Sequence, residues 1–201
     1  FSDKFGAKGC FFGVNGASGL IQSAVIAMAN PGETILMPRN VHISVIKTCA
    51  MQNILPIFFD LEFSSETGHY KPITKIWLEN VFKKINFNEN KIVGVILVSP
   101  SYHGYAGDLE PLIDLCHQHN LPVLVDEAHG SYFLFCENLN LPKSALISNA
   151  DLVVHSLHKS LNGLTQTAAL WYKGNLVNEQ NLIKSINLLQ TTSPSSLLLS
   201  S

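Results

Sequence analysis

The stretch Pro122-Val123-Leu124-Val125-Asp126-Glu127-Ala128-His129-Gly130 decides the fold, because it joins a short apolar strand directly to a polar segment. The later stretch Asp151-Leu152-Val153-Val154-His155 does the same, since it continues into Ser156-Leu157-His158-Lys159-Ser160. Open α/β sheets build their ligand sites where the carboxyl ends of strands meet. These two stretches therefore predict an α/β sheet with a polar site at one edge.

Apolar segments with strand-like and helical patterns alternate along the rest of the chain. The run IVGVILV at residues 92–98 is continuous and rich in β-branched residues, which is typical of a parallel strand covered on both faces. Further strands are expected at residues 34–37, 55–59 and 168–172, and helices at residues 20–29, 41–51, 73–85, 109–119 and 176–189. No repeat or linker interrupts the alternation, so we predict one domain, a three-layer α/β/α sandwich with a mostly parallel sheet.

The composition limits the classes of protein to which the chain can belong. Its net charge is -2 and it contains no basic run, which argues against a nucleic-acid partner. No apolar run approaches the roughly 18 residues of a membrane span, and no signal sequence opens the chain. We expect a soluble, cytoplasmic protein with no membrane partner.

Low charge and scattered cysteines give two further expectations. Charged residues make up 14% of the chain, well below the roughly 25% of an average soluble domain, so we expect other parts of the protein to cover much of this surface. The chain is therefore interpreted as a fragment. The absence of a C-x-x-C pair favours reduced core thiols over disulfides or a zinc site for the four cysteines, which are Cys10, Cys49, Cys116 and Cys136.

The glycine-rich segment at residues 13–19, GVNGASG, precedes a predicted helix. Backbone N–H groups and the positive end of the helix dipole at such a place can hold a phosphate. The spacing matches neither a Rossmann fingerprint nor a Walker A loop. Two interpretations stay open for this segment alone: a phosphate site, or a helix start that Ser18 caps.

Asp126 stands at the end of a buried strand, where an unpaired carboxylate is costly. It therefore acts either as the partner of a cation or as a helix cap. The four letters at residues 126–129 also match the Walker B segment of certain helicases. A motor of that kind needs a P-loop lysine and a basic strand-binding channel, and the chain has neither, so we reject this interpretation.

Lys159 follows the other strand end, beside histidine and hydroxyl side chains that can depress the pKa of an amine. A lysine with a lowered pKa is the nucleophile that forms a Schiff base with a carbonyl cofactor. Pyridoxal phosphate needs such a lysine, a phosphate site and a carboxylate opposite its pyridine nitrogen. An ordinary surface lysine is the alternative, but it would leave the joint presence of the three features unexplained.

At this point the chain resembles the large, cofactor-binding domain of the ornithine/lysine/arginine decarboxylases, which are fold-type I pyridoxal-phosphate enzymes. The resemblance implies that residues 1–201 are one incomplete domain, without the family's N-terminal segment and small C-terminal domain. The matching segments are Val14-Asn15-Gly16-Ala17-Ser18-Gly19, Pro38-Arg39-Asn40-Val41-His42-Ile43-Ser44, Ser99-Pro100-Ser101-Tyr102-His103-Gly104, Val125-Asp126-Glu127-Ala128-His129-Gly130 and Ser156-Leu157-His158-Lys159.

The resemblance also implies roles for single residues. Lys159 would bind pyridoxal 5'-phosphate covalently, and Asp126 would keep the pyridine nitrogen protonated so that the ring accepts electrons. Ala17 and Ser18 would bind the phosphate at the start of the helix.

Five more residues receive roles by the same resemblance. Ser156 and His158 would add phosphate or cofactor contacts, and His42 would stack on one face of the ring. Ala128 would pack against the other face, and His129 would lie at the cofactor's edge. For His42 taken alone, a partly buried histidine with satisfied hydrogen bonds is the alternative.

The activity implied by the resemblance is α-decarboxylation of arginine, lysine or ornithine, a small-molecule amino acid, in polyamine metabolism. Lys159, Asp126, His129 and His42 would be its catalytic residues, and the enzyme would be a homodimer or a higher homo-oligomer. The alternatives are another fold-type I reaction, such as transamination or aldol cleavage, and a truncated remnant without catalysis.

The remaining polar side chains of note receive simpler interpretations. His117 and His119 share a predicted helix but point to different faces, and no carboxylate or thiolate joins His155 to a metal-binding set, so we predict no metal site. Tyr102 and His103 follow the central strand, where they contact substrate or cofactor or only pack a turn.

Overall fold

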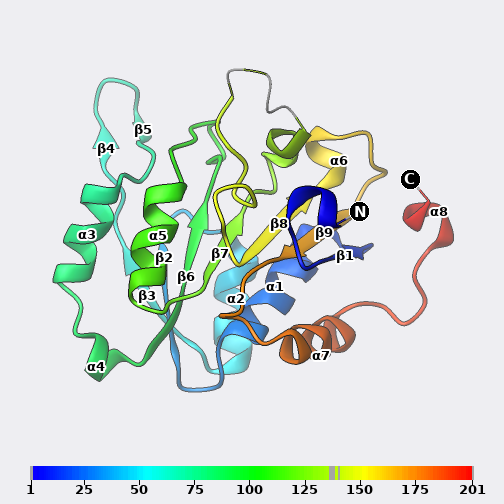
Figure 1. The fold of residues 1–201 in the computed structure, drawn as a ribbon, viewed down its shortest axis with the longest axis horizontal. Helices are drawn as coiled ribbons and strands as arrows, with labels where there is room; N and C mark the ends of the chain where they lie inside the picture. Colours follow the sequence, from blue (N-terminus) through cyan, green and yellow to red (C-terminus); the bar gives the residue numbers. More distant parts are fainter. Residues whose placement is uncertain (1, 136–138, 140, 201) are drawn as a thin grey trace.

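The computed structural model describes residues 2–135, 139 and 141–200 (Figure 1). Its main sheet has seven strands in the order β1-β9-β8-β7-β6-β2-β3, and β4 and β5 form a separate hairpin. The strands are β1 (Gly9–Gly13), β2 (Thr34–Pro38), β3 (Leu55–Phe59), β4 (Phe63–Ser64), β5 (His69–Tyr70), β6 (Ile92–Val98), β7 (Val123–Asp126), β8 (Leu152–Ser156) and β9 (Ala168–Tyr172). Cys136 lies outside the described residues.

The prediction of a mostly parallel sheet is confirmed. Strands β3, β2, β6, β7 and β8 pair in parallel, whereas β9 runs antiparallel to both β8 and β1. Strand β1 was not predicted, because its five residues, GCFFG, are short and bounded by glycine. The parallel arrangement brings the carboxyl ends of β2, β6, β7 and β8 to one edge of the sheet.

Helices cover both faces of the sheet, which gives the predicted three layers (Figure 1). The long helices are α1 (Gly16–Met28), α2 (Ile43–Gln52), α3 (Lys75–Lys83), α5 (Glu110–Gln118) and α7 (Glu179–Leu189). Short helices are α4 (Phe87–Asn90), α6 (Leu157–Ser160) and α8 (Ser196–Leu199), with 3-10 turns η1 (Ser2–Phe5) and η2 (Ser131–Phe135). Within the described residues, no helix is both long and apolar enough to cross a membrane.

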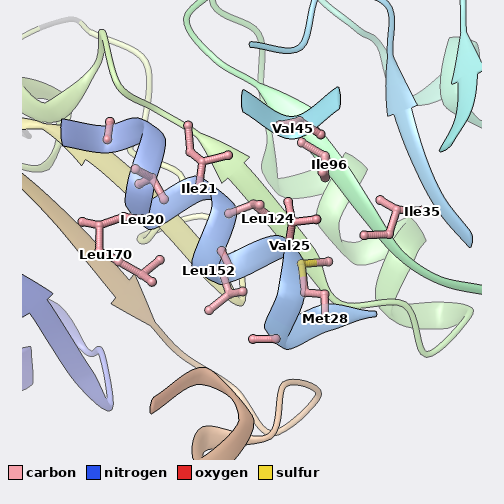
Figure 2. Packing of buried hydrophobic residues seen from close by; sticks show 14 of the residues in the cluster. Leu20, Ile21, Val25, Met28, Ile35, Val45, Ile96, Leu124, Leu152 and Leu170 are labelled. Atoms are coloured by element: carbon pink, nitrogen blue, oxygen red, sulfur yellow. The ribbon is translucent and has the colours of Figure 1, made fainter. Parts of the chain in front are cut away.

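Helix α1 is apolar on most of its surface because neighbours surround it. It packs on β7, β8 and β9 and between α2 and α7. Figure 2 shows Leu20, Ile21 and Val25 of α1 directed at strand residues that include Leu124 and Leu152. Leu20, Leu124 and Leu152 are fully buried, and each such side chain contributes roughly 1.5–3 kcal/mol relative to exposure. This packing fixes the amino end of α1 beside the carboxyl ends of the central strands.

A second core lies on the other face of the sheet, under α3 and α5. It contains Val125 of β7, Val153 of β8 and Trp171 of β9. Because side chains alternate along a strand, the neighbouring residues Leu124, Leu152 and Leu170 belong to the α1 face. This alternation decides on which face each polar residue at a strand end lies.

Candidate active site

A pocket of about 280 Å³ opens at the carboxyl ends of β2, β6 and β7 and at the amino end of α1. It unites seven of the nine residues predicted for the site. These are Ala17, Ser18, His42, Asp126, Ala128, His129 and Lys159. A larger hollow, of about 650 Å³, lies between β3 and α3, and none of the predicted site residues lines it. The smaller pocket is therefore the candidate active site.

Asp126 supplies the buried acid of this pocket. It is the last residue of β7 and is 8% exposed. Its Oδ1 accepts the backbone N–H of Ala128 at 3.1 Å. Burial raises the pKa of the Asp126 carboxyl, while the Ala128 N–H and the charges of His42 and Lys159 oppose that rise. The sequence predicted a need for a cationic partner, and the pocket provides nearby cationic groups.

Lys159 reaches the pocket from the single turn of α6 that follows β8. Its side chain is exposed, and its Nζ lies 3.1 Å from Nε2 of His129. An ammonium can only donate, so His129 Nε2 accepts and carries no proton in this contact. Loss of hydration and the nearby Lys159 lower the pKa of His129, which favours the same neutral form. The amine is thus held by a neutral imidazole, near enough to Asp126 for its charge to oppose the rise of that pKa.

The amino end of α1 forms a third part of the pocket wall, through Ala17 and Ser18. The N-cap residue is Asn15, and it makes no side-chain hydrogen bond to the first turn, which carries no acidic side chain. The structure therefore excludes Ser18 as the cap. First-turn N–H groups have no partner inside a helix, and together with the helix dipole they suit an anion.

His42 and Ala128 occupy two further sides of the pocket. His42 is the N-cap of α2, where its Nδ1 accepts the N–H of Ser44 at 3.2 Å, and the ring is exposed. Ala128 is 5% exposed and packs against the core that contains α1. His42 is exposed but is hydrogen-bonded to Ser44, so neither the alternative of a histidine with satisfied hydrogen bonds nor the predicted stacking on a ring is decided.

The structure places Ser156 and His158 outside the pocket lining. Ser156 is fully buried, and its Oγ lies 3.3 Å from Nδ1 of His158. The same nitrogen donates to the carbonyl of Thr167 at 3.2 Å. The two side chains thus contact each other, and His158 also contacts the residue before β9, while their predicted phosphate contacts stay predictions.

The pocket also contains residues to which the sequence assigned no role. Asn40, Val41 and Ile43 follow β2, Pro100 follows β6, and Ile21 lies one turn beyond Ser18 on α1. Asn40 Oδ1 is buried and has no hydrogen-bond partner within the described part of the chain. For the residues after β2 and β6, their position just after predicted strand ends was the signal that could have found them.

The sequence left two roles open for Tyr102 and His103, contact with a ligand or packing of a turn, and the structure places the two residues differently. Tyr102 is 84% exposed, lines the pocket, and meets the His129 ring edge-on at 5.9 Å. His103 is absent from the pocket lining and stacks on His69 of β5 at 4.2 Å. Tyr102 is therefore placed for a ligand contact, and His103 packs the turn against the β4–β5 hairpin.

The other histidines that the sequence singled out form separate contacts. Nε2 of His117 lies 2.8 Å from Oδ2 of Asp151, whereas His119 stacks on Phe87 at 5.1 Å. Among the described residues, no group of three or more His, Cys, Asp or Glu side chains is placed to hold a metal ion.

Comparison with known proteins gives a family match over the whole chain. Residues 1–201 match the model of the Orn/Lys/Arg decarboxylase major domain. The arginine decarboxylase of Bacillus cereus is 39% identical over 197 residues, covering 98% of this chain and 42% of that protein. The arginine decarboxylase of Bacillus subtilis is 37% identical over 200 residues, covering 100% of this chain and 40% of that protein.

Solved structures agree on the fold. Lysine decarboxylase A from Pseudomonas aeruginosa superposes with a TM-score of 0.81 at 19% identity, covering 100% of this chain and 29% of that one. This likeness shows the shared fold alone. The chain spans about two-fifths of the length of the curated relatives that it matches, at 42% and 40%.

Proposed function

Because this chain belongs to the Orn/Lys/Arg decarboxylase family, we propose that its pocket binds pyridoxal 5'-phosphate and that the protein decarboxylates a basic amino acid. One observation carries the proposal. The buried Asp126, the amine of Lys159 and the amino end of α1 line the same pocket, although they are far apart in the sequence.

The chemistry of these groups fits the cofactor. Pyridoxal phosphate has an anionic phosphate, a pyridine nitrogen and a carbonyl carbon, which need N–H donors, a carboxylate and an amine respectively. The pocket wall offers each of them, through the first turn of α1, Asp126 and Lys159. When bound, the cofactor supplies the electron sink that accepts the electron pair of the broken bond.

The residues of the chain would bind and orient the reacting groups. Asp126 would hold a proton on the pyridine nitrogen, and this ion pair would relieve the cost of burying its carboxylate. His129, neutral at Nε2, would hold the Lys159 amine in place. His42 and Ala128 would confine the ring from two sides, since both line the pocket.

We propose arginine as the first substrate to test, with lysine and ornithine as alternatives. The support is the name of the curated relatives cited above, at 39% and 37% identity. The amine product would feed polyamine formation. Part of the substrate pocket would belong to the rest of the protein, since the chain spans only about two-fifths of those relatives.

The whole protein would contain residues 1–201 as its cofactor-binding domain and would act as a cytoplasmic homo-oligomer. Two exposed apolar side chains at the pocket support an oligomer, because Ile43 is 52% exposed and Tyr102 is 84% exposed. Large apolar side chains at the mouth of a ligand site are typical of surfaces that another chain covers.

The test is to supply the purified full-length protein with pyridoxal phosphate and to offer arginine, lysine and ornithine separately. Release of carbon dioxide and the corresponding amine in equal amounts is the expected result, with Lys159→Ala inactive. Transfer of the amino group to a 2-oxo acid would instead assign an aminotransferase. A protein that binds the cofactor but forms no product would be the catalytically silent alternative.

A further inference from the structure

Glu127, the residue after Asp126, is a fully buried carboxylate that the proposed chemistry does not use. Three donors surround it. Its Oε1 accepts the N–H of Ala145 at 2.8 Å, and its Oε2 lies 2.7 Å from both Ser144 Oγ and His155 Nε2. A buried carboxylate is tolerated when its oxygens are satisfied in this way. Glu127 is therefore an acceptor for two separate parts of the fold, the segment at Ser144 and Ala145 and strand β8 at His155.

Trp171 fixes the protonation of His155. The indole N–H can only donate, and it lies 3.0 Å from Nδ1 of His155, so that nitrogen carries no proton. The proton of the neutral ring is consequently on Nε2, which donates to Glu127. Trp171, His155 and Glu127 thus form a directed chain of hydrogen bonds. All three side chains are at most 2% exposed, so water does not replace any of these partners.

This chain of hydrogen bonds lies behind the candidate active site, on the opposite face of the sheet. Trp171 belongs to the core under α3 and α5, whereas Ala17 and Ala128 of the pocket belong to the core around α1. Side chains alternate along a strand, so Asp126 and Glu127 leave β7 on opposite faces. Glu127 therefore supports the strand end that carries Asp126 without touching the pocket.

The same region joins the two strand ends that bear Asp126 and Lys159. The carboxylate of Glu127 bonds to His155, and in addition the backbone N–H of Glu127 donates to the carbonyl of Val154 at 3.0 Å. Ser131 Oγ lies 3.2 Å from the carbonyl oxygen of Ser156, just before the turn that carries Lys159. Any shift of β7 against β8 at this end must break these bonds.

We propose that Glu127 is a positioning residue for the decarboxylase site, and that with His155 and Trp171 it fixes the distance between Asp126 and Lys159. This inference rests on the proposed function for its chemical consequence. Its structural part stands without the cofactor, because the hydrogen bonds join elements of this chain alone.

The substitution Glu127→Gln tests the directed chain with little change of volume. A glutamine whose oxygen accepts the N–H of Ala145 turns its NH₂ group toward His155 and Ser144, which are themselves donors. His155 can accept only by moving its proton to Nδ1, where it would face the indole N–H of Trp171. The substitution therefore makes two donors face each other somewhere among these hydrogen bonds. Trp171→Phe relieves this clash because it removes the indole donor.

Asp151, the residue before β8, provides a matched control that bonds to the first residue of β7. It is 2% exposed, and its Oδ2 lies 2.8 Å from both His117 Nε2 and the backbone nitrogen of Val123. Asp151→Asn, like Glu127→Gln, replaces a buried carboxylate by its amide, and both carboxylates bond to a histidine and to a backbone N–H. Asp151 lies at the opposite ends of β7 and β8, away from the pocket.

The experiment measures the affinity of the full-length protein for pyridoxal phosphate by visible absorption, beside thermal unfolding of each variant. Glu127→Gln is expected to weaken binding by roughly tenfold, about 1.4 kcal/mol. Asp151→Asn is expected to lower stability but leave affinity within about twofold. Trp171→Phe alone is expected to weaken affinity less than Glu127→Gln does, because His155 keeps its hydrogen bond to Glu127. The double variant of Glu127→Gln with Trp171→Phe is expected to regain much of the lost affinity.

Hydrogen exchange of the cofactor-free protein separates this inference from the proposed function. Glu127→Gln should speed exchange in peptides covering residues 126–131 and 156–160, and Asp151→Asn should not. Equal effects of the two variants on affinity and on exchange, or no recovery in the double variant, would overturn the positioning role. A wild-type protein that fails to bind the cofactor would overturn the proposed function, while the exchange pattern would still decide the role of Glu127.

Discussion

Replacing Asp126 by asparagine should stabilise the cofactor-free protein while weakening its hold on the cofactor. Burial raises the pKa of this carboxyl, so the folded protein binds its proton more tightly than the unfolded chain does. Above that raised pKa, the charged carboxylate destabilises the fold, and the penalty vanishes as the pH falls toward the ordinary value of 3.8. Asparagine removes the charge, and its Oδ1 can still accept the N–H of Ala128.

The expected magnitudes follow from these contacts. A stabilising replacement at a functional site commonly adds about 1 kcal/mol, which for a chain of this size raises Tm by roughly 2–4 °C at neutral pH. In the cofactor complex, Asp126→Asn loses a charge-assisted hydrogen bond worth roughly 1.5–3 kcal/mol. Affinity for pyridoxal phosphate should therefore fall roughly 10- to 100-fold.

The assay combines thermal unfolding without cofactor, at neutral and acidic pH, with a cofactor titration. The gain in Tm should shrink as the pH falls, because the wild-type carboxyl then takes up its proton. A cofactor-free Asp126→Asn protein that melts below wild type at neutral pH would refute the electrostatic argument. Unchanged cofactor affinity would refute the assignment of Asp126 to the pyridine nitrogen.

Three further predictions concern separate parts of the molecule. Lys159→Ala should abolish covalent cofactor attachment but change stability by less than about 0.5 kcal/mol, because the side chain is exposed; a large fall in Tm would contradict this. Asp151→Ala should cost about 2–3 kcal/mol in urea unfolding, since Val123 N–H and His117 lose a buried acceptor, and a neutral effect would count against that bond. Burial and nearby Asp151 raise the pKa of Cys116 to about 12, so iodoacetamide at neutral pH should modify it only after denaturation.

The sequence predicted the sheet well where apolar runs were continuous. Strands β3, β6 and β9 begin and end at the predicted residues, because each run is short, apolar and bounded by turns. The predicted ends of the long helices differ by up to four residues, as at α1, which begins at Gly16 rather than near residue 20. Strand β1 was missed because its pairing with β9, in which Gly9 lies opposite Tyr172 at a separation of 163 residues, decides its existence rather than a local pattern.

Part of the candidate site was predictable for a geometric reason. Carboxyl ends of parallel strands meet at one edge, so Asp126 and Lys159 could be grouped from the sequence, whereas His42 was assigned only by the family resemblance. The chain of hydrogen bonds from Trp171 to Glu127 could not be predicted from the sequence. Its members are separated by 16 and 28 residues, and only the pairing of β7, β8 and β9 aligns them on one face.

The predicted cofactor contacts of Ser156 and His158 stay predictions, but the directions of their side chains could not be read from the sequence. Ser156 ends β8 and His158 lies in α6 beside Lys159, yet the side chain of Ser156 contacts His158, and that of His158 also contacts Thr167. Sequence position fixed their neighbourhood but not their direction. The direction of each side chain depends on the backbone of α6, and this helix of four residues is too short to give a periodic pattern in the sequence.

The most direct test of the central claim is to map where pyridoxal phosphate attaches. The purified protein is mixed with the cofactor, reduced with borohydride and digested, and the modified peptide is identified by mass. We predict a single reduced adduct on Lys159, absent from Lys159→Ala. An adduct on another lysine, or a folded protein with none, would contradict the account.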